Sequence, residues 1–255
     1  MINYGKVSII TPTYNSERFI KDTYDSLRKQ TYTNWEWLVT DDCSTDSTIF
    51  ILKEISAKDS RVKISSLKRN SGAAVSRNNS LSISSGDFIA FLDSDDLWEP
   101  SKLEKQLTFM QNQKNIDFSF TSYQIIDESG TPLGKIVDNT HAEQSFSYED
   151  MLKKKATLGC STVLLRAATF NNIKMPNLRT GQDYALWLSL LRAGHKAHLL
   201  KIPLSKYRIC TNSISRNKFK KSFRQWKIYR EIEHINFFDS LILFLFYAWR
   251  AFFRK

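Results

Sequence analysis

The chain has 255 residues, of which 42% are hydrophobic and 13% aromatic, so it can bury a core and is too apolar for a disordered protein. Its formal net charge is +11, and residues 201–255 carry most of the excess, with 13 basic and 3 acidic side chains. Three widely spaced cysteines support neither a disulfide framework nor a zinc site, which favours a reducing cytosol. The first residues form no apolar signal segment, so export by that route is not expected.

Short apolar runs alternate with helical patterns through the first 92 residues. In chain order they predict a strand over 6–11, a helix over 15–30, a strand over 35–40, a helix over 44–57, a strand over 62–67, a helix over 73–84 and a strand over 87–92. Asn15 or Ser16, and Ser44 or Asp46, are suited to cap the first two helices. The alternation predicts an α/β fold with a mostly parallel central sheet that helices cover on both faces.

Beyond residue 103 the pattern is mixed, with strands predicted over 118–126 and 157–165, a turn at 128–130 and a helix over 183–193. The last apolar segment, 237–253, is interrupted by Asp239 and Arg250, so it falls short of the ~20 apolar residues of a spanning helix. Behind the basic stretch 201–230, it is typical of an amphipathic helix in a membrane interface. A helix packed on the body of the protein is the alternative.

Polar clusters follow three of the predicted strands, at 11–15, 41–42 and 93–96. Because ligands bind at the carboxyl ends of strands in open α/β sheets, these clusters should meet in one crevice. The strongest cluster is Asp93-Ser94-Asp95-Asp96, since adjacent carboxylates at the end of an apolar strand repel one another unless a cation neutralises them. A magnesium or manganese ion there would bridge the protein to a diphosphate. An exposed acidic turn is the alternative.

A second acidic cluster, Asp41-Asp42-Cys43-Ser44-Thr45-Asp46, follows the strand over 35–40. A carboxylate at a strand end can accept the imide N–H of uracil and so read a nucleotide base. Helix capping by Asp42 or Ser44 is the alternative, and it accounts for one acidic residue but not for three in six positions.

Together these stretches resemble the glycosyltransferases of family 2, which have the GT-A type nucleotide-sugar fold. The resemblance rests on VSIITPTYNSERFI, VTDDCSTDST, NSGAAVSRNNSLSISSGDFIAFLDSDD, GQDYALWLSLLRAGHK and PLSKYRICTNSISRNK, and it covers most of the chain, from about Val7 to Lys218. Each motif alone is weak, whereas the ordered set is specific. It implies a single GT-A domain over 1–218, with a nucleotide-binding half (1–100) and an acceptor half (101–218), followed by a basic, aromatic helical tail (219–255).

The resemblance also implies roles for individual residues. Nucleotide-binding positions are Pro12, Tyr14, Asp42, Arg77 and Ser94; the metal ligands, for Mn²⁺ or Mg²⁺, are Asp93 and Asp95; supporting positions are Asp41, Asp96 and Arg208. Asp183 matches the catalytic base, which takes the proton of the acceptor hydroxyl in an inverting transfer. Helix N-capping is the alternative for Asp183.

Two positions depart from the family pattern. Gln182 stands where many relatives have Glu, and Cys210 stands where many have His; Arg208 and Arg216 are candidates to replace the missing contact. Trp98, just after the acidic cluster, is a candidate to shape the donor or acceptor pocket. No role is assigned to the four histidines.

By the same resemblance, we expect a hexose, glucose or galactose, to pass from a UDP-sugar with β linkage to a lipid-linked GlcNAc-diphosphate acceptor of O-antigen or capsule synthesis. The protein would then lie peripherally on the cytoplasmic face of a bacterial inner membrane, with residues 201–255 on its anionic surface. The alternatives are an inactive nucleotide-sugar-binding scaffold and a nucleic-acid-binding module. No zinc pattern or helix-turn-helix accompanies the basic tail, so no nucleic acid partner is expected.

Overall fold

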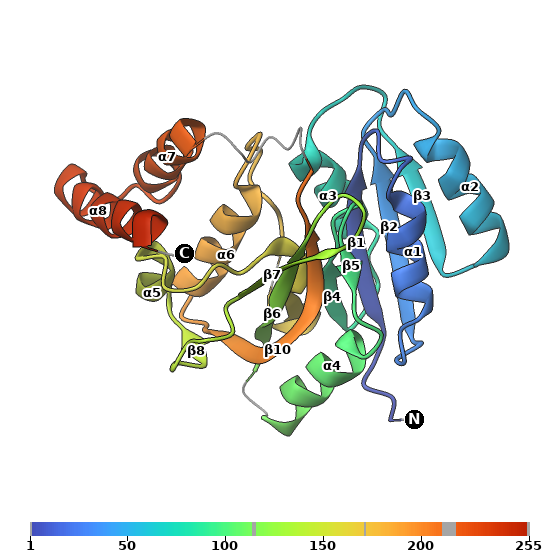
Figure 1. Cartoon of the computed structure of the whole chain (residues 1–255), viewed down its shortest axis with the longest axis horizontal. Coiled ribbons are helices and arrows are strands. Elements are labelled where there is room, and N and C mark those ends of the chain that lie inside the picture. Colours follow the sequence, from blue (N-terminus) through green and yellow to red (C-terminus); the bar gives the residue numbers. More distant parts are fainter. Residues whose placement is uncertain (1, 114–115, 171, 211–217, 254–255) are drawn as a thin grey trace.

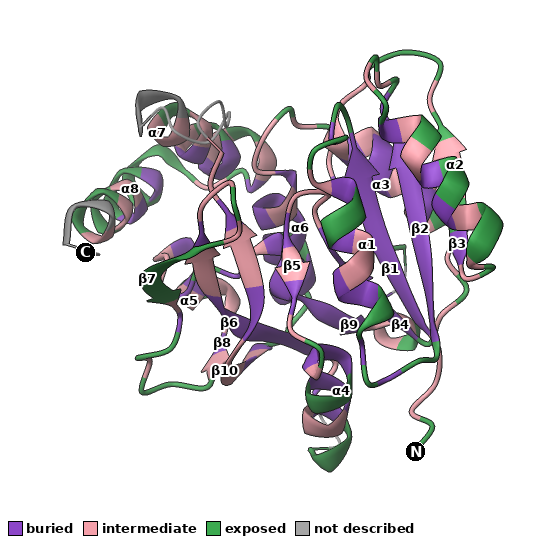
Figure 2. Ribbon diagram, turned by 45° about the vertical axis from the view of Figure 1, so that its right-hand side comes forward, coloured by how far each residue is buried: buried purple, intermediate pink, exposed green. Residues whose placement is uncertain are grey.

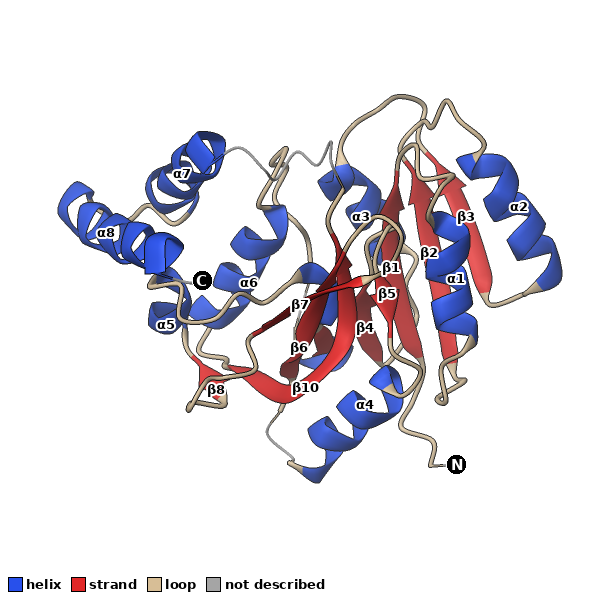
Figure 3. Cartoon of the chain, in the orientation of Figure 1, coloured by secondary structure: helices blue, strands red, loops and turns tan. Residues whose placement is uncertain are grey.

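The computed structural model describes residues 2–113, 116–170, 172–210 and 218–253. It contains a twisted ten-stranded sheet with helices on both faces (Figures 1 and 3). The main strand order is β3-β2-β1-β4-β9-β6-β10-β5, with β7 paired to β6 and β8 to β10.

The first half of the sheet is parallel, as predicted. It consists of β1 (Val7–Thr13), β2 (Trp35–Asp41), β3 (Val62–Ser66) and β4 (Phe88–Phe91), connected by the helices α1 (Ile20–Arg28), α2 (Thr48–Lys58) and α3 (Ala73–Ser82). Successive side chains of β1 point to opposite faces: Ile9 packs in one cluster with residues of α1 and α2, and Ile10 packs in another with Ala74 of α3. Both faces of these strands are therefore buried, which explains their continuous apolar runs.

The first two helices begin later than predicted. Asn15 has a left-handed backbone (φ 49°), and the carbonyl of Ser16 accepts the N–H groups of Phe19 and Ile20, so neither side chain caps α1. The Asp46 carboxylate accepts the N–H of Thr48 at 3.0 Å and so supports the start of α2. In both segments the polar residues form a loop at the sheet edge instead of a first helical turn.

The second half of the sheet is mixed. It contains β5 (Leu97–Trp98), β6 (Phe118–Ile126), β7 (Pro132–Val137), β8 (Ser145–Phe146), β9 (Leu164–Arg166) and β10 (Ala197–Arg208), with the helices α4 (Lys102–Asn112), α5 (Tyr148–Leu152) and α6 (Gln182–Arg192). The strand predicted over 157–165 is wrong for most of its length, because Cys160–Thr162 form a 3₁₀ turn and only the end joins β9. The polar groups of that turn form hydrogen bonds with the side chains of Gln106, Asp96 and Ser205 instead of pairing with the backbone of a neighbouring strand.

The C-terminal segment forms α7 (Lys218–Lys227), a π-helical turn (Ile228–Ile232) and α8 (Phe237–Phe253), and α8 has the bounds predicted for it. Ile228, Tyr229 and Leu243 are buried in the same cluster as α6, and the Tyr229 hydroxyl donates to the carbonyl of Leu152 at 2.6 Å. The outer side of α8 is exposed (Figure 2). No helix among the described residues is long and apolar enough to cross a membrane.

Candidate active site

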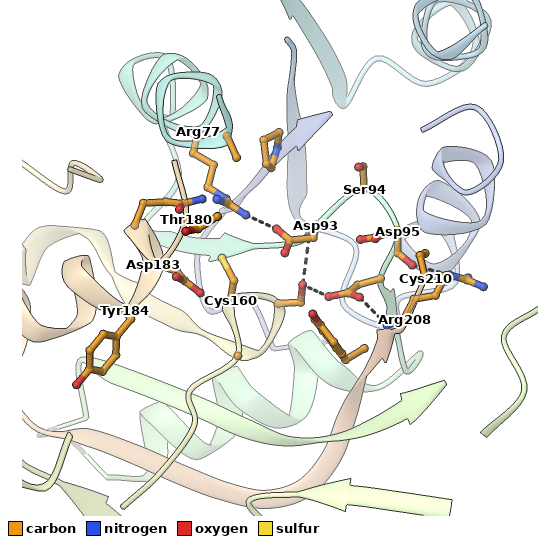
Figure 4. Close-up of a pocket in the computed structure, with 18 of the residues that line it drawn as sticks. Arg77, Asp93, Ser94, Asp95, Cys160, Thr180, Asp183, Tyr184, Arg208 and Cys210 are labelled. Carbon is orange, nitrogen blue, oxygen red and sulfur yellow. Dashed lines mark hydrogen bonds and ion pairs between the residues drawn. The ribbon is translucent and has the colours of Figure 1, made fainter. Parts of the chain in front are cut away.

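A cleft of about 1170 Å³ opens at the carboxyl ends of β1, β2 and β4. Its lining includes Pro12, Asp42 and Asp93, one from each predicted polar cluster, so the expected convergence of the strand ends is confirmed. Asp183, from the start of α6, lines the same cleft. In Figure 4, Asp93 lies between Asp183 and Asp95.

Asp93 is held by a buried arginine of α3. Arg77, 4% exposed, donates from Nη2 to Oδ1 of Asp93 at 2.5 Å (Figure 4). Burial opposes the charge of Arg77, but the nearby carboxylates of Asp93 and Asp183 outweigh it and raise the pKa of Arg77. Nε of Arg77 is buried without a hydrogen-bond partner among the described residues.

Asp96 holds the acidic turn, residues 93–96, in place through two hydrogen bonds. Its Oδ2 accepts the Ser161 hydroxyl at 2.6 Å, and its Oδ1 accepts the backbone N–H of Arg208 at 2.9 Å. Burial, followed by the charges of Asp95 and Asp93, raises the pKa of Asp96. The Asp93 N–H donates to Ser161 Oγ at 3.1 Å, so one hydroxyl ties both ends of the turn together.

Asp93 and Asp95 are the carboxylates that could hold a metal ion. Burial and the charge of Asp93 raise the pKa of Asp95 to about 6, which indicates negative charge in excess of its protein partners. No group of three His, Cys, Asp or Glu side chains arranged to bind a metal occurs in the described part of the chain. Two carboxylates still fit Mg²⁺ or Mn²⁺, since magnesium is usually bound by one or two carboxylates together with substrate phosphates.

Arg208 fixes the acidic turn to the end of β10. Its Nε donates to the carbonyl of Asp95 at 2.7 Å, its Nη1 donates to the carbonyl of Glu128 at 2.7 Å, and its guanidinium lies 4.8 Å from the centre of the Phe19 ring. These contacts occupy it within the protein, although it also lines the cleft with Cys210. Arg216, the other candidate to replace the missing histidine, lies outside the described residues.

At the carboxyl end of β2, Asp42 organises the loop before α3. Its two carboxylate oxygens accept the N–H groups of Ser71 and Gly72, each at 2.7 Å, and it lines the cleft. Gly72 needs a positive φ of 94°, which favours glycine. Tyr14 is 47% exposed in the cleft, and it lies at the same end as Asp42 and Pro12.

Asp41 and Ser94 have more local contacts. The Asp41 carboxylate accepts the N–H and the hydroxyl of Ser44 at 3.0 and 2.5 Å, and Asp41 does not line the cleft. Ser94 lines it, and its hydroxyl lies 2.8 Å from that of Ser16. Asp41 thus stabilises the loop, whereas Ser94 is accessible from the cleft.

Asp183 lies in the first turn of α6, after the left-handed Gly181 (φ 77°). The N-cap is Gly181, and no side chain caps this helix, so the capping alternative for Asp183 is wrong. The partial positive charge of the helix N-terminus favours a carboxylate here. Asp183 is partly exposed and lines the cleft.

Sequence reasoning missed or misplaced several residues. Trp98 is 3% exposed and donates to the carbonyl of Ser161, so it packs in the core and does not shape the pocket. Ser161 itself was not anticipated, because no motif marks a serine that acts through a buried hydroxyl. Lys221 and Arg224 of α7 also line the cleft, although the sequence predicted for this stretch only a basic membrane-facing surface.

Comparison with known families decides what kind of protein carries this cleft. The model of Glycosyl transferase family 2 matches residues 8–166. The chain belongs to this family. It is therefore a glycosyltransferase, as the resemblance implied.

Relatives within the family match nearly the whole chain. TuaG of Bacillus subtilis, whose name describes a glycosyltransferase of teichuronic acid biosynthesis, is 45% identical over 96% of this chain and 95% of its own. WfgD of Escherichia coli, named as a UDP-Glc:alpha-D-GlcNAc-diphosphoundecaprenol beta-1,3-glucosyltransferase, is 43% identical over 87% of this chain and 84% of its own. WfaP of Escherichia coli has the same descriptive name and is 37% identical over 95% and 92%.

Solved structures share the fold. S. aureus TarS, in complex with UDP-GlcNAc, superposes with a TM-score of 0.73 at 24% identity, covering 89% of this chain and 65% of the TarS chain. The mannosyltransferase PcManGT of Pyrobaculum calidifontis, in complex with GDP-Man and Mn²⁺, superposes with a TM-score of 0.64 at 14% identity, covering 88% and 61%. At these identities the likeness establishes the GT-A fold alone, in agreement with the predicted fold class.

Proposed function

We propose that this glycosyltransferase transfers a hexose, most simply glucose, from a UDP-sugar to a lipid-linked GlcNAc-diphosphate acceptor, with inversion to a β linkage. The observation that carries the proposal is that Asp183 lines one cleft with Asp93 and Asp95, although these lie about ninety residues earlier in the chain. WfgD and WfaP, whose names describe this donor and acceptor, support the choice of glucose over galactose. The name of TuaG supports a place in bacterial surface polysaccharide synthesis.

In this proposal the donor lies along the carboxyl ends of β1, β2 and β4. Pro12, Tyr14 and Asp42 would enclose the uracil, while Arg77 and Ser94 would face the rest of the nucleotide. Asp93 and Asp95 would hold Mn²⁺ or Mg²⁺, and Asp41, Asp96 and Arg208 would support that end of the cleft. When bound, the metal neutralises the charge of the departing diphosphate.

Asp183 would act on the acceptor. A carboxylate in hydrogen-bond reach of the acceptor hydroxyl takes its proton as the oxygen attacks the anomeric carbon. The C–O bond to the sugar forms as the bond to the diphosphate breaks, on opposite faces of the ring, which inverts the α linkage of the donor. The position of Asp183 across Asp93 from Asp95 (Figure 4) supports this division of roles.

We further propose that residues 201–255 hold the enzyme peripherally on the cytoplasmic face of the bacterial inner membrane. The tail, residues 219–255, would serve as the membrane-contacting part beside the catalytic domain of residues 1–218. Phe238, Leu245 and Trp249 of α8 are 77%, 62% and 65% exposed, and the segment is strongly basic. Exposed aromatic residues beside Lys and Arg are typical of a helix in an anionic membrane interface.

The test is transfer from a panel of UDP-sugars with Mn²⁺ to a synthetic GlcNAc-diphosphate-lipid, with Asp95→Ala as the control. A metal-dependent product from one donor, abolished by the substitution, supports the proposal and names the sugar. Absence of UDP release with every donor, and of metal-dependent UDP binding, would contradict it and favour an inactive scaffold. Salt-sensitive binding of DNA or RNA without need of the acidic cluster would instead favour a nucleic-acid-binding module.

A further inference from the structure

Basic side chains gather at the Asp183 end of the cleft. The cleft lining there includes four of them, from three separate segments of the chain: Lys154, Arg179, Lys221 and Arg224. None belongs to the motifs on which the family resemblance rests. Asp183 is an acidic residue among them, so this end carries a net positive charge.

Arg224 lies directly against the start of α6. A Cβ added at Gly181 would lie 2.9 Å from Cδ and 3.1 Å from Nε of Arg224, so the arginine side chain crosses over this glycine. Gly181 is two residues before Asp183. On the next residue along the helix, the Lys154 ammonium lies 3.0 Å from the centre of the Tyr184 ring. Two cationic side chains therefore lie against residues within two positions of the proposed base.

Lys221 and Arg224 have no acidic partner within the described part of the chain. Partial burial of Lys221, followed by the nearby positive charge of Arg224, lowers the pKa of Lys221. Two like charges that face one cleft without a counter-ion are unfavourable in the free protein, and a bound anion would relieve that cost.

Two buried amides lie in the same wall. Gln182 and Gln225 are 8% and 3% exposed, and both line the cleft. The Gln225 side chain interacts with the hydroxyl groups of Tyr184 and Tyr229, whereas Oε1 of Gln182 has no hydrogen bond within the described residues. A buried polar atom without a partner costs free energy, so the free protein leaves the Gln182 oxygen as an unused acceptor in this wall.

We propose that Lys221 and Arg224 form a second anion subsite, which binds the diphosphate of the acceptor while its sugar hydroxyl faces Asp183. The inference rests on the proposed function, in which the donor diphosphate is held at Asp93 and Asp95, the other end of the cleft. It assigns two roles to one tail. In this proposal α7 binds the diphosphate of the acceptor, and α8 lies on the membrane that contains the acceptor's lipid. The two helices pack together through the rings of Trp226 and Phe244, whose centres are 5.8 Å apart.

The test compares two acceptors and two pairs of substitutions. The acceptors are a GlcNAc-diphosphate-lipid analogue and a GlcNAc alkyl glycoside without phosphate. The test variant is Lys221→Gln/Arg224→Gln. The control is Lys53→Gln/Lys58→Gln, which removes the same charge from exposed positions of α2.

In the test variant we expect the KM for the diphosphate acceptor to rise about 10- to 100-fold, because charge-assisted hydrogen bonds are lost. The KM for the UDP-sugar, and the rate with the phosphate-free acceptor, should match those of the control. Arg224→Lys, which keeps the charge, should retain most of the affinity. An unchanged KM for the acceptor would overturn the inference, and so would an equal rise in KM for the donor, which would assign these cations to the donor diphosphate.

A binding measurement separates this inference from the proposed function. Calorimetric titration of the UDP-loaded full-length protein with the soluble GlcNAc-diphosphate analogue needs no turnover. Weaker binding in the test variant than in the control supports the subsite even when no donor reacts. Equal binding by both variants contradicts the subsite even when transfer is observed.

Discussion

The two ends of the cleft are built in different ways. At the proposed donor end, Pro12 lies near the end of β1, and Asp42 and Asp93 come just after β2 and β4, so the parallel sheet fixes their positions through the backbone. At the acceptor end, Asp183 begins a helix, and Arg224 comes from a tail helix packed against that helix start. The donor end is a property of the sheet, whereas the acceptor end depends on packing between distant segments. Substitutions at the two ends of the cleft should therefore have different effects on activity and stability.

The largest loss of activity should come from Asp183→Asn. The amide keeps the size of the side chain but cannot take a proton, so kcat should fall about 10²- to 10⁴-fold. The KM for the UDP-sugar should stay near that of the wild type, because in the proposed function Asp183 acts on the acceptor and not on the donor. Steady-state kinetics with a varied donor checks this. Transfer at the wild-type rate would remove Asp183 from the chemistry.

Ser161→Ala tests the hydrogen bonds that join Asp93 and Asp96, the two ends of the acidic turn. The substitution leaves a buried oxygen of Asp96 and the N–H of Asp93 without their partner, which should cost about 1–3 kcal/mol of unfolding free energy and loosen the turn proposed to bind the metal. Urea unfolding and the Mn²⁺ dependence of transfer measure the two effects. Ser189→Ala, at an exposed serine that bonds only within α6, is the matched control. Equal effects of both substitutions would contradict the role of Ser161.

Membrane binding by the tail should depend on the exposed apolar side chains of α8. Phe238→Ser/Leu245→Ser removes two exposed apolar side chains of α8, and binding to vesicles with anionic lipid should weaken about tenfold or more. Co-sedimentation measures this. Phe50→Ser is the control, because Phe50 is 62% exposed on α2, away from the tail. If both variants bind vesicles equally, α8 is not the membrane-contacting surface.

The smallest expected effect concerns the donor-end sheet, at Glu36 of β2. Burial opposes the charge of Glu36, but hydrogen bonds from Lys63, Ser8 and Ser85 outweigh it and lower its pKa to about 2. Since the folded-state pKa lies below the unfolded value, this carboxylate stabilises the protein above about pH 4.3 and loses that effect as the pH falls towards 2.

Glu36→Gln should therefore cost about 1 kcal/mol at pH 7, and the difference from wild type should shrink on acidification. Urea unfolding at pH 7 and pH 3 measures it. A difference that is constant with pH would show that the effect is steric.

The same contrast explains what the sequence could predict. The four parallel strands and the convergence of Pro12, Asp42 and Asp93 follow from local apolar patterns and from the rule that ligands bind at strand ends, whereas Asp183, which lies at the start of a helix, was indicated only by the family resemblance. Ser161 could not be predicted, because its role depends on a hydrogen bond to a residue 65 positions away. The turn at Cys160–Thr162 was mistaken for strand because tertiary hydrogen bonds override the β propensity of its residues.

The tail was predicted in part. The apolar composition of 237–253, interrupted by Asp239 and Arg250, identified α8 within its observed bounds. The placement of Lys221 and Arg224 in the cleft depends on the burial of Ile228 and Tyr229 against α6, and a net charge carries no information about that packing.

The most direct test of the account is the anomeric configuration of the product made from UDP-glucose, determined by proton NMR. If Asp183 activates the acceptor hydroxyl for a single displacement, only the β-linked product forms. An α-linked product would contradict it, since retention requires either two displacements or attack from the face that the diphosphate leaves.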